Sequence, residues 1–266
     1  MDAGRVAAVR DVLAGGRLAA GQDRLLGEQI LRLHPAAGRL VREANWYHRL
    51  AARQAVTGTV PGCPAPPATG VIFTCCGYPL PGGFHAGSPR DSAQGASPGA
   101  LFGYACADRA ASRYCRARLA LPDPGRVCAY QPPSLEPADM LGSPEAQRIL
   151  QRGPVMVQLQ LCAPLWAPGF CAWALGEYAR ILRRYGSGST VMLTLGVPGS
   201  KPDGGLTAGL GTAFRFYPHT ERDIARWVQE ARMTLAGLGD VRGPGPDWAA
   251  PRDRARRLVR AVAVVP

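Results

Sequence analysis

The segment Pro154-Val-Met-Val-Gln-Leu-Gln-Leu-Cys162 is the feature that most restricts the fold of this chain. It is apolar along nearly its whole length, whereas a strand with one face in solvent alternates regularly between apolar and polar residues. Such a run is typical of a central parallel strand that helices cover on both faces. Parallel strands need long crossover connections, which are usually helices. The segment therefore predicts an α/β fold.

The rest of the chain supplies the alternation of strands and helices that a parallel sheet requires. Residues 4–56 have apolar positions at helical spacing, interrupted at Gly15 and Gly16, and so predict separate helices. Ligands of open α/β sheets bind beyond the carboxyl ends of the strands. The segments at these ends are 74–85, 104–108, 130–135 and 162–168. The predicted strands are 71–76, 100–106, 127–130, 154–162 and 189–196, and the predicted helices after residue 56 are 107–119, 144–150, 170–185 and 220–238.

A length of 266 residues suffices for one large α/β domain with an N-terminal extension. We expect a helical extension or cap over 1–56, a Rossmann-like domain over 57–250 and a basic C-terminal tail over 251–266. For this last segment a basic helix, a final strand and a frayed tail are all open alternatives. The chain has no apolar stretch of about eighteen residues and no signal-peptide pattern after Met1. We therefore expect a soluble, cytoplasmic protein that does not associate with membranes.

The formal net charge is +12, and Lys201 is the only lysine, so arginine carries almost all of the positive charge. Guanidinium groups bind sulfate, phosphate and carboxylate through two parallel hydrogen bonds. An anionic small-molecule ligand or an acidic protein partner is therefore expected. Nucleic-acid binding would require a basic stripe with interleaved aromatic residues or a known module. The arginines are scattered instead, with one dense run at 252–260, so nucleic acid is not an expected partner.

The eight cysteines do not have the spacing of a metal site. No pair has the two-residue gap of a zinc knuckle, and the adjacent Cys75 and Cys76 would point to opposite faces of a strand. Several of the cysteines lie inside apolar runs, where cysteine acts as a small buried hydrophobic residue. We therefore expect no metal site.

Several short motifs follow one another along most of the chain. The motifs are Val9–Gly16, Asp23-Arg24, Ala44-Asn45, Gly77-Tyr78-Pro79, His85, Glu136-Pro137, Ser143-Pro144-Glu145, Gly153-Pro154-Val155 and Thr220–Ile224. Their order and spacing resemble an actinobacterial family of S-adenosylmethionine (SAM) dependent methyltransferases, once classed as a domain of unknown function. The resemblance runs from about Ala8 to Trp248. It implies a Rossmann-like class I methyltransferase fold, with a mostly parallel sheet, helices on both faces and an N-terminal helical extension.

The chain departs from that family where SAM is bound. The family's first strand ends in Asp-Ile-Gly-Thr-Gly, whose acid anchors the ligand and whose first glycine lets the backbone approach it. Here Phe73 stands in place of the acid and Cys75 in place of the glycine. The family's ribose-binding acid falls at Cys106, with Asp108 two positions later. A thiol is a weak substitute for a carboxylate that accepts hydrogen bonds from both ribose hydroxyls.

Two further departures follow the third and fourth strands. The acid that binds the adenine amino group falls near Pro133, and the histidine after the fourth strand falls at Pro164. Four changes at four strand ends predict that SAM is not bound in the usual manner. We therefore expect no cofactor, with SAM as the open alternative.

The leading hypothesis is a repurposed biosynthetic enzyme whose pocket binds an anionic intermediate. Arg10 replaces an aromatic residue of the family's opening motif. We expect it to hold a sulfate, phosphate or carboxylate and to stabilise the departure of this group in an elimination or ring closure. His85 or His48 would be the general base, although either can equally be an ordinary core or surface histidine. The other expected ligand-binding residues are Asn45, Thr74, Cys75, Cys76, Gly77, Tyr78, Tyr104, Cys106, Asp108 and Gln160.

Three other hypotheses stay open. Methyl transfer depends mainly on positioning, so an active SAM-dependent methyltransferase does not need the family's acids. A non-catalytic pseudo-methyltransferase subunit of a heteromer would use the apolar groups Leu165-Trp166 and Phe170 as an interface. A cysteine nucleophile at Cys75 or Cys76 is the fourth idea, and it is disfavoured because thiols in apolar runs are usually inert.

Overall fold

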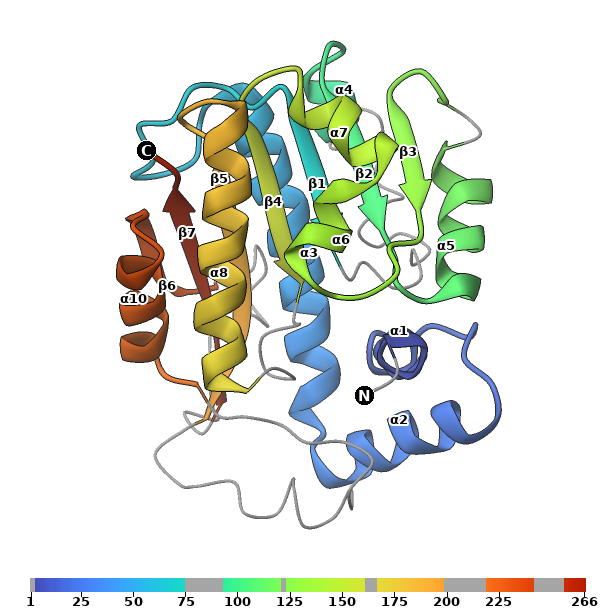
Figure 1. Cartoon of the computed structure of the whole chain (residues 1–266). Helices are drawn as coiled ribbons and strands as arrows, with labels where there is room; N and C mark the ends of the chain where they lie inside the picture. The colour runs from blue at the N-terminus through green and yellow to red at the C-terminus, as the bar shows by residue number, and fades with distance from the viewer. Residues whose placement is uncertain (1–2, 75–92, 121–122, 161–166, 199–218, 242–255) are drawn as a thin grey trace.

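A seven-stranded sheet lies at the centre of the molecule, with helices on both of its faces (Figure 1). The computed structural model describes residues 3–74, 93–120, 123–160, 167–198, 219–241 and 256–266. The strand order is β3-β2-β1-β4-β5-β7-β6, in which β1 to β5 are parallel and β7 runs antiparallel between β5 and β6. The predicted mostly parallel sheet is therefore confirmed. The strands are β1 (Gly70–Thr74), β2 (Leu101–Ala105), β3 (Val127–Tyr130), β4 (Val155–Gln160), β5 (Thr190–Pro198), β6 (Thr234–Asp240) and β7 (Arg256–Val264).

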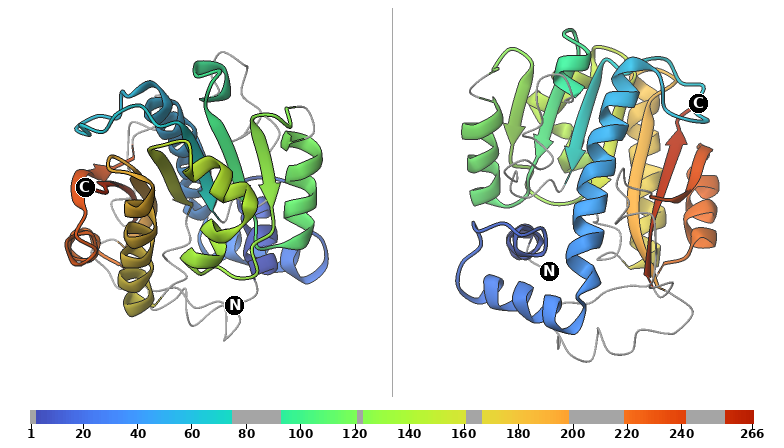
Figure 2. Two further views of the ribbon diagram at one scale, coloured as in Figure 1. Left: turned by 45° about the horizontal axis from the view of Figure 1, so that its top comes forward. Right: turned by 180° about the vertical axis from the view of Figure 1, so that it is seen from behind.

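Strand β4 is covered on both sides, as its apolar sequence predicts. Val155, Val157 and Leu159 belong to the core on one face, and Met156 belongs to the core on the other. The first face carries α6 (Pro137–Gly142), α7 (Pro144–Leu150), α8 (Pro168–Leu182) and α10 (Glu221–Glu230). The second face carries α3 (Ala36–Thr57) and α5 (Arg109–Cys115), which continues into a turn of π-helix, η1 (Arg116–Ala120). The view from behind shows α3 lying along the sheet (Figure 2).

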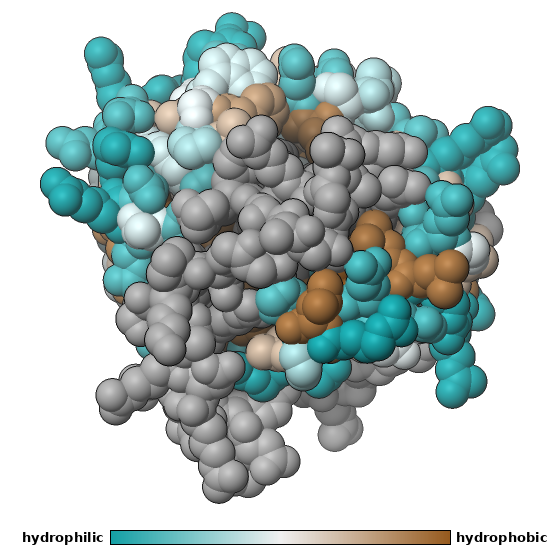
Figure 3. Space-filling model, turned by 90° about the horizontal axis from the view of Figure 1, so that it is seen from below, coloured by the Kyte–Doolittle hydropathy of each residue, from teal (hydrophilic) through white to brown (hydrophobic). Residues whose placement is uncertain are grey.

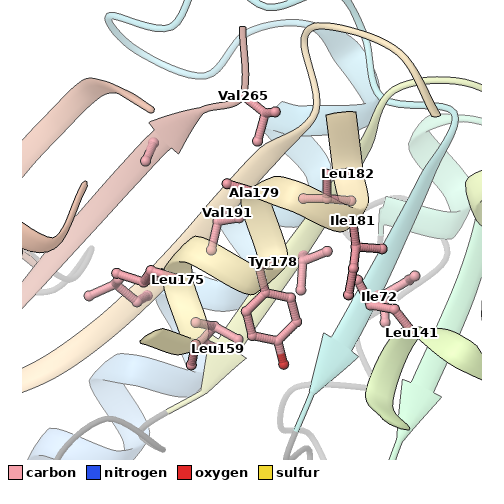
Figure 4. Close-up of a cluster of buried hydrophobic side chains, with 14 of the residues drawn as sticks. Ile72, Leu141, Leu159, Leu175, Tyr178, Ala179, Ile181, Leu182, Val191 and Val265 are labelled. Carbon is pink, nitrogen blue, oxygen red and sulfur yellow. The ribbon is translucent and has the colours of Figure 1, made fainter. Parts of the chain in front are cut away.

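The core under α8 explains why this helix forms where the amphipathic pattern predicts it. Leu175, Tyr178, Ala179 and Leu182 all project from one side of α8 toward the sheet (Figure 4). Burial of each large apolar side chain stabilises the fold by about 1.5–3 kcal/mol. The helix ends at Leu182 and is followed by a short 3₁₀ helix, η3 (Arg183–Tyr185). The chain then changes direction at Gly186, which has a φ of 115°.

Two helices at the N-terminus, α1 (Ala3–Leu13) and α2 (Gly21–Leu33), lie below the sheet in Figure 1. The connection between them closes around the buried side chain of Asp11, whose Oδ2 accepts the N–H groups of Leu18 at 2.7 Å and Ala19 at 3.1 Å. A Cβ atom on Gly16 would lie 2.0 Å from Oδ1 of Asp11. The aspartate and the second glycine of the opening motif therefore have a shared structural role.

The prediction of a helix over 220–238 is wrong for its second half. It begins as expected, with Thr220 as N-cap in a capping box with Asp223, but it ends at Glu230. Arg232 then takes a left-handed conformation with a φ of 53°, which a continuing helix does not allow. Residues 234–240 form β6 because they pair with β7.

The C-terminal segment, for which three alternatives were open, forms a strand. Residues 256–264 are β7, hydrogen-bonded to β5 on one side and to β6 on the other. Its apolar side chains alternate between the two cores, with Leu258 and Val262 on the α3 side and Val259 and Ala261 on the α8 side. These residues are thus part of the sheet and not a tail. Helix α3 of the predicted extension is likewise one of the layers that cover the sheet.

Candidate functional site

The carboxyl ends of β1, β2 and β4 lie at the edge of the sheet nearest α1 (Figure 1). Helix α1 packs against α3 and α5, which flank these ends. The strand order reverses between β1 and β4, and such a switch point is where open α/β sheets bind ligands. The candidate site is therefore this edge, with α1 and α3 beside it.

The surface seen from below includes apolar side chains among hydrophilic ones (Figure 3). In the N-terminal region, Leu25 and Leu33 of α2 are 62% and 46% exposed, and Leu18, in the connection before α2, is 40% exposed. A monomeric protein can expose single apolar side chains without functional meaning. These leucines therefore describe the surface of the cap and are not assigned a role.

Arg10 and Asn45 are two expected site residues that the structure brings together. Arg10 lies in the last turn of α1 and is half-buried, and Asn45 is buried on α3. Nη2 of Arg10 donates a hydrogen bond to Oδ1 of Asn45 at 2.9 Å. This bond uses one of the five N–H groups of the guanidinium and fixes the orientation of the whole planar group.

His48 lies one helical turn after Asn45 and is completely buried between α3 and the sheet. Nε2 of Gln158 donates to the backbone carbonyl of His48 at 3.0 Å, so the other amide atom, Oε1, faces the ring. Oε1 lies 2.9 Å from Nδ1 of His48 and can only accept, so Nδ1 carries the proton. Nε2 of the ring then accepts from the hydroxyl of Thr194 at 2.8 Å. Both ring nitrogens are thereby used.

The electrostatic state of His48 agrees with this hydrogen bonding. Burial lowers its pKa to about 3, although the hydrogen bond with Gln158 acts in the opposite direction; the positive charge of Arg10 lowers the pKa further. A fully buried, neutral ring whose two nitrogens are engaged has no route to a substrate proton. The expected role of His48 as a general base is therefore not supported, and its position indicates a structural role.

Thr74 ends β1 and is also tied to Gln158. Its hydroxyl donates to the backbone carbonyl of Gln158 at 2.9 Å, and its side chain is completely buried. Gln158 therefore connects three elements, namely α3 through His48, β5 through the ring and Thr194, and β1 through Thr74. Thr74 lies at the expected strand end, but its hydroxyl holds two strands together.

Tyr104 is a core residue of the face that α3 covers. Its ring stacks on Phe73, its register partner on the neighbouring strand, with centroids 4.8 Å apart and planes 11° from parallel. Both side chains are 3% exposed. The position at which the resemblance places a SAM-binding acid is therefore occupied by Phe73, whose ring packs on Tyr104.

The end of β2 carries sulfur atoms and a helix cap. Cys106 is buried, and its Sγ lies 3.5 Å from Sγ of Cys115. Burial raises the pKa of the Cys115 thiol to about 12, and the negative charge of Asp108 acts in the same direction. The carboxylate of Asp108 accepts the N–H of Ala111 at 2.6 Å and so caps α5. Asp108 is therefore already used where a ribose-binding acid would be needed.

Several expected site residues cannot be placed. Cys75, Cys76, Gly77, Tyr78 and His85 lie outside the described residues, as do Pro164 and Leu165-Trp166, and of Gln160 only the backbone at the end of β4 is described. Within the described ranges, no three His, Cys, Asp or Glu side chains are arranged to hold a metal ion. None of the helices in these ranges is both long enough and apolar enough to cross a bilayer.

Sequence reasoning missed Thr194 and the pair Arg260 and Tyr47. Nη1 of Arg260 donates to the Tyr47 hydroxyl at 3.1 Å, and its guanidinium carbon lies 5.4 Å from the centre of the tyrosine ring. Burial raises the pKa of Tyr47, and the charge of Arg260 opposes this shift. The available signal was the alternation of apolar residues after Leu258, which places Arg260 on the face of the sheet toward α3.

The described residues do not fit SAM in the way the resemblance requires. The position of the first acid is an aromatic ring in the core, the position of the second is the buried Cys106, and the nearest carboxylate caps a helix. A ligand hydroxyl pair needs a carboxylate that is free to accept both hydrogen bonds. These anchors are absent from the described part of β1 and β2.

Comparison with known proteins places the fold. No protein-family model matches the sequence, and no curated protein matches it. Among solved structures, the chain is similar to a candidate methyltransferase from Thermobifida fusca, with a TM-score of 0.73 and 19% identity over 98% of this chain and 94% of that one. A DUF574 family protein from Streptomyces avermitilis gives 0.72 and 19%, covering 98% and 97%. A geranyl diphosphate methyltransferase in complex with SAM gives 0.50 and 13%, covering 96% and 95%.

These likenesses show the fold. The chain has a Rossmann-like class I methyltransferase fold, shared with two actinobacterial proteins over almost the whole length of each. The resemblance found in the sequence is confirmed at this level.

Proposed function

We propose that this chain, built on a class I methyltransferase fold, binds an anionic small molecule at the carboxyl ends of its strands through Arg10, and no longer binds SAM in the manner of that fold. The observation that carries the proposal is the hydrogen bond from Arg10 to Asn45, which orients a half-buried guanidinium beside this edge. A guanidinium held in this way is suited to a sulfate, phosphate or carboxylate group.

The state of the former anchor positions supports the second half of the proposal. Phe73 and Tyr104 form one stacked pair in the core, so a polar ligand group has no acceptor there. Asp108 is engaged as the cap of α5. Positive charge is thus oriented beside the candidate site, while the described ends of β1 and β2 lack a free carboxylate.

The chemistry that suits this arrangement is elimination or ring closure with an oxyanion as leaving group. In an elimination, a base removes a proton from carbon, a carbon–carbon double bond forms, and the carbon–oxygen bond breaks so that its electron pair leaves with the sulfate, phosphate or carboxylate. Arg10 would neutralise the charge that develops on the departing oxygen. Of the two histidines expected as general base, His48 is buried and neutral, so the proposal assigns this role to His85, which lies outside the described residues.

The deciding experiment is calorimetric titration of the purified protein with SAM and with a panel of small organic sulfates, phosphates and carboxylates. We expect no micromolar SAM binding and saturable binding of at least one class of anion. Arg10→Met should weaken that binding at least about tenfold, because it removes a charge-assisted hydrogen-bonding group. Arg17→Met, which removes an exposed arginine of the same N-terminal region, is the matched control and should change affinity less than about twofold.

The alternative is an active SAM-dependent methyltransferase, which is favoured by the solved structures that share the fold. Micromolar SAM binding at one molecule per chain would support this alternative and contradict the proposal. A protein that binds neither SAM nor any anion of the panel would also contradict it.

A further inference from the structure

The helix beside the outer edge of the sheet carries a row of arginines on one side. Arg109, Arg113 and Arg116 follow one another along α5 and the start of η1 at spacings of four and three residues, which places them on one helix face. All three side chains are exposed. We call these three residues the arginine stripe. It spans about 10 Å along the helix, at about 1.5 Å per residue.

The arginines of the stripe differ from other exposed arginines of this chain in their ion pairing. Arg24, Arg180 and Arg226 each pair with a carboxylate three or four residues away in the same helix. In the part of the chain that the structure describes, no carboxylate pairs with any member of the stripe. Among the described residues, Arg116 alone of the three has a hydrogen-bond acceptor, the backbone carbonyl of Ala129 at 3.4 Å. The three guanidinium groups are therefore exposed, and no carboxylate of the described ranges forms an ion pair with them.

We infer that the arginine stripe is a docking surface for a different protein, one that presents acidic side chains along a helix. Exposed carboxylates at the same spacing of four and three residues would face the three guanidinium groups at once. A second copy of this chain is a poor partner, because two molecules that each carry a net charge of +12 repel one another.

Nucleic acid fits the stripe less well. Proteins that bind single strands place aromatic rings between the basic residues, so that bases stack on them. The one aromatic residue in 109–120 is Tyr114, which helical spacing places away from the stripe and whose ring lies under the guanidinium of Arg118 at 5.8 Å. The stripe therefore supplies charge at a helical spacing but no stacking platform.

The position of the stripe relates docking to the candidate site. Helix α5 begins directly after β2, at the carboxyl end of the sheet, and packs against α1, the helix that carries Arg10 (Figure 1). From there it runs along the outer edge formed by β3. A partner bound to the stripe would lie next to the edge at which ligands of this fold bind. The inference does not depend on the ligand of that site.

The test uses a fluorescent helical peptide with glutamate at positions separated by four and three residues, titrated with the full chain and followed by anisotropy. R109Q/R113Q/R116Q removes the stripe. R24Q/R180Q/R226Q is the matched control, since it also removes three exposed arginines and gives the same net charge. We expect the stripe variant to bind about tenfold more weakly, because three exposed ion pairs each contribute about a factor of two, and the control to change less than about twofold.

The outcomes separate the explanations. Equal weakening in both triple variants would mean that only net charge matters and would overturn the inference. Stripe-dependent binding of a duplex DNA probe that is tighter than binding of the peptide would overturn it in favour of nucleic acid. R109K/R113K/R116K keeps the charges and should bind within about twofold of the wild type. Circular dichroism of each variant checks that the fold is intact. If the glutamine triple variant is unfolded, R109Q/R113Q is used in its place and should bind about fourfold more weakly than the wild type, and unchanged binding would overturn the inference.

Discussion

At the scale of single residues, the three polar side chains buried between α3 and the sheet have the strictest requirement for hydrogen-bond partners. His48, Gln158 and Thr194 have no exposed surface, so each polar atom must find a partner within the protein. Gln158 bonds to His48 of α3 and to Thr74 of β1, and the His48 ring extends the group to Thr194 of β5. The group therefore fixes the rotation of α3, and with it the position of Asn45.

The first prediction concerns Thr194→Val, which keeps the size of the side chain and removes its hydroxyl. Nε2 of His48 then loses its donor, and an unsatisfied buried acceptor costs about 1–3 kcal/mol in free energy of unfolding. Urea unfolding measures this loss. Thr194→Ser is the control: it loses about 0.8 kcal/mol for one methyl group but keeps the donor. The ¹⁵N shift of His48 Nε2 should change in the valine variant alone, and an unchanged shift in both would contradict the assigned tautomer.

The second prediction is a pH dependence of stability that His48 causes. Its pKa is lowered to about 3 by burial in the folded state, against about 6.5 in the unfolded state. Between these values the unfolded chain binds a proton that the folded chain does not. Stability is therefore full above pH 6.5 and falls as the pH drops toward 3, by up to about 1.4 kcal/mol per pH unit.

This dependence is isolated by comparing the wild type with His48→Gln in urea unfolding from pH 7.5 to 4.5. The variant should be less stable at pH 7.5 but should lose stability less steeply on acidification. The acidic residues and the other histidines titrate in both proteins and cancel in the comparison. Parallel curves would contradict the prediction.

The sequence selected some residues that the structure brings together and misjudged the surroundings of others, for a physical reason. Arg10 and Asn45 could be chosen because they lie in short motifs, and the structure joins them by a hydrogen bond. The catalytic role expected for His48 is not supported, because burial is a tertiary property. Helical spacing indicates that a residue faces the sheet, but not whether water reaches it. Thr194 was missed because a threonine in a strand has no distinctive pattern.

At the scale of elements, the turn between α10 and β6 is where local pattern and tertiary structure diverge. The amphipathic pattern after Thr220 predicts the start of the helix, but Thr234-Leu-Ala-Gly-Leu-Gly-Asp240 has weak preferences for either structure. Its strand form depends on pairing with β7, whose partner residues lie 19 to 30 positions further along the chain. The same pairing turns the basic segment before Pro266 into a strand, a choice that the sequence left open.

The third prediction uses the strained residue in this turn. Arg232 is the one residue other than glycine with a positive φ in the described ranges. Arg232→Gly relieves about 1–2 kcal/mol of left-handed strain and costs about 0.5–1 kcal/mol in unfolded-state entropy. A net gain of about 0.5–1 kcal/mol in free energy of unfolding should follow. Arg232→Ala removes the same side chain without relieving the strain, so a glycine variant no more stable than the alanine variant would contradict the prediction.

At the scale of the whole molecule, the fold was predictable and the content of its ligand edge was not. The run of apolar strands and intervening helices fixes a parallel sheet, and the solved structures confirm the class I methyltransferase fold over nearly the full chain. At the position where the sequence resemblance places the first SAM-binding acid, Phe73 packs against Tyr104 in the core beneath α3. The aromatic side chain at position 73 therefore belongs to a core that β1, β2 and α3 form together.

The fourth prediction follows from the burial of Phe73. Phe73→Asp restores the acid of the first strand but removes a buried ring, which costs about 3–5 kcal/mol, and adds a carboxylate to an apolar core. A loss of this size is a large share of the roughly 5–15 kcal/mol that stabilises a typical domain. We expect urea unfolding to show a severely destabilised protein and calorimetry to show no gain of SAM affinity.

Phe73→Leu is the control for that variant, because a smaller apolar side chain in the same place should cost less than about 1.5 kcal/mol. If Phe73→Asp were as stable as the leucine variant and bound SAM, the side chain at 73 would face a polar ligand site and not the core. Strong destabilisation in the aspartate variant alone means that the acid cannot be restored at this position without also replacing Tyr104 and the residues of α3 that pack on it. The loss of the anchor is then a property of the assembled fold.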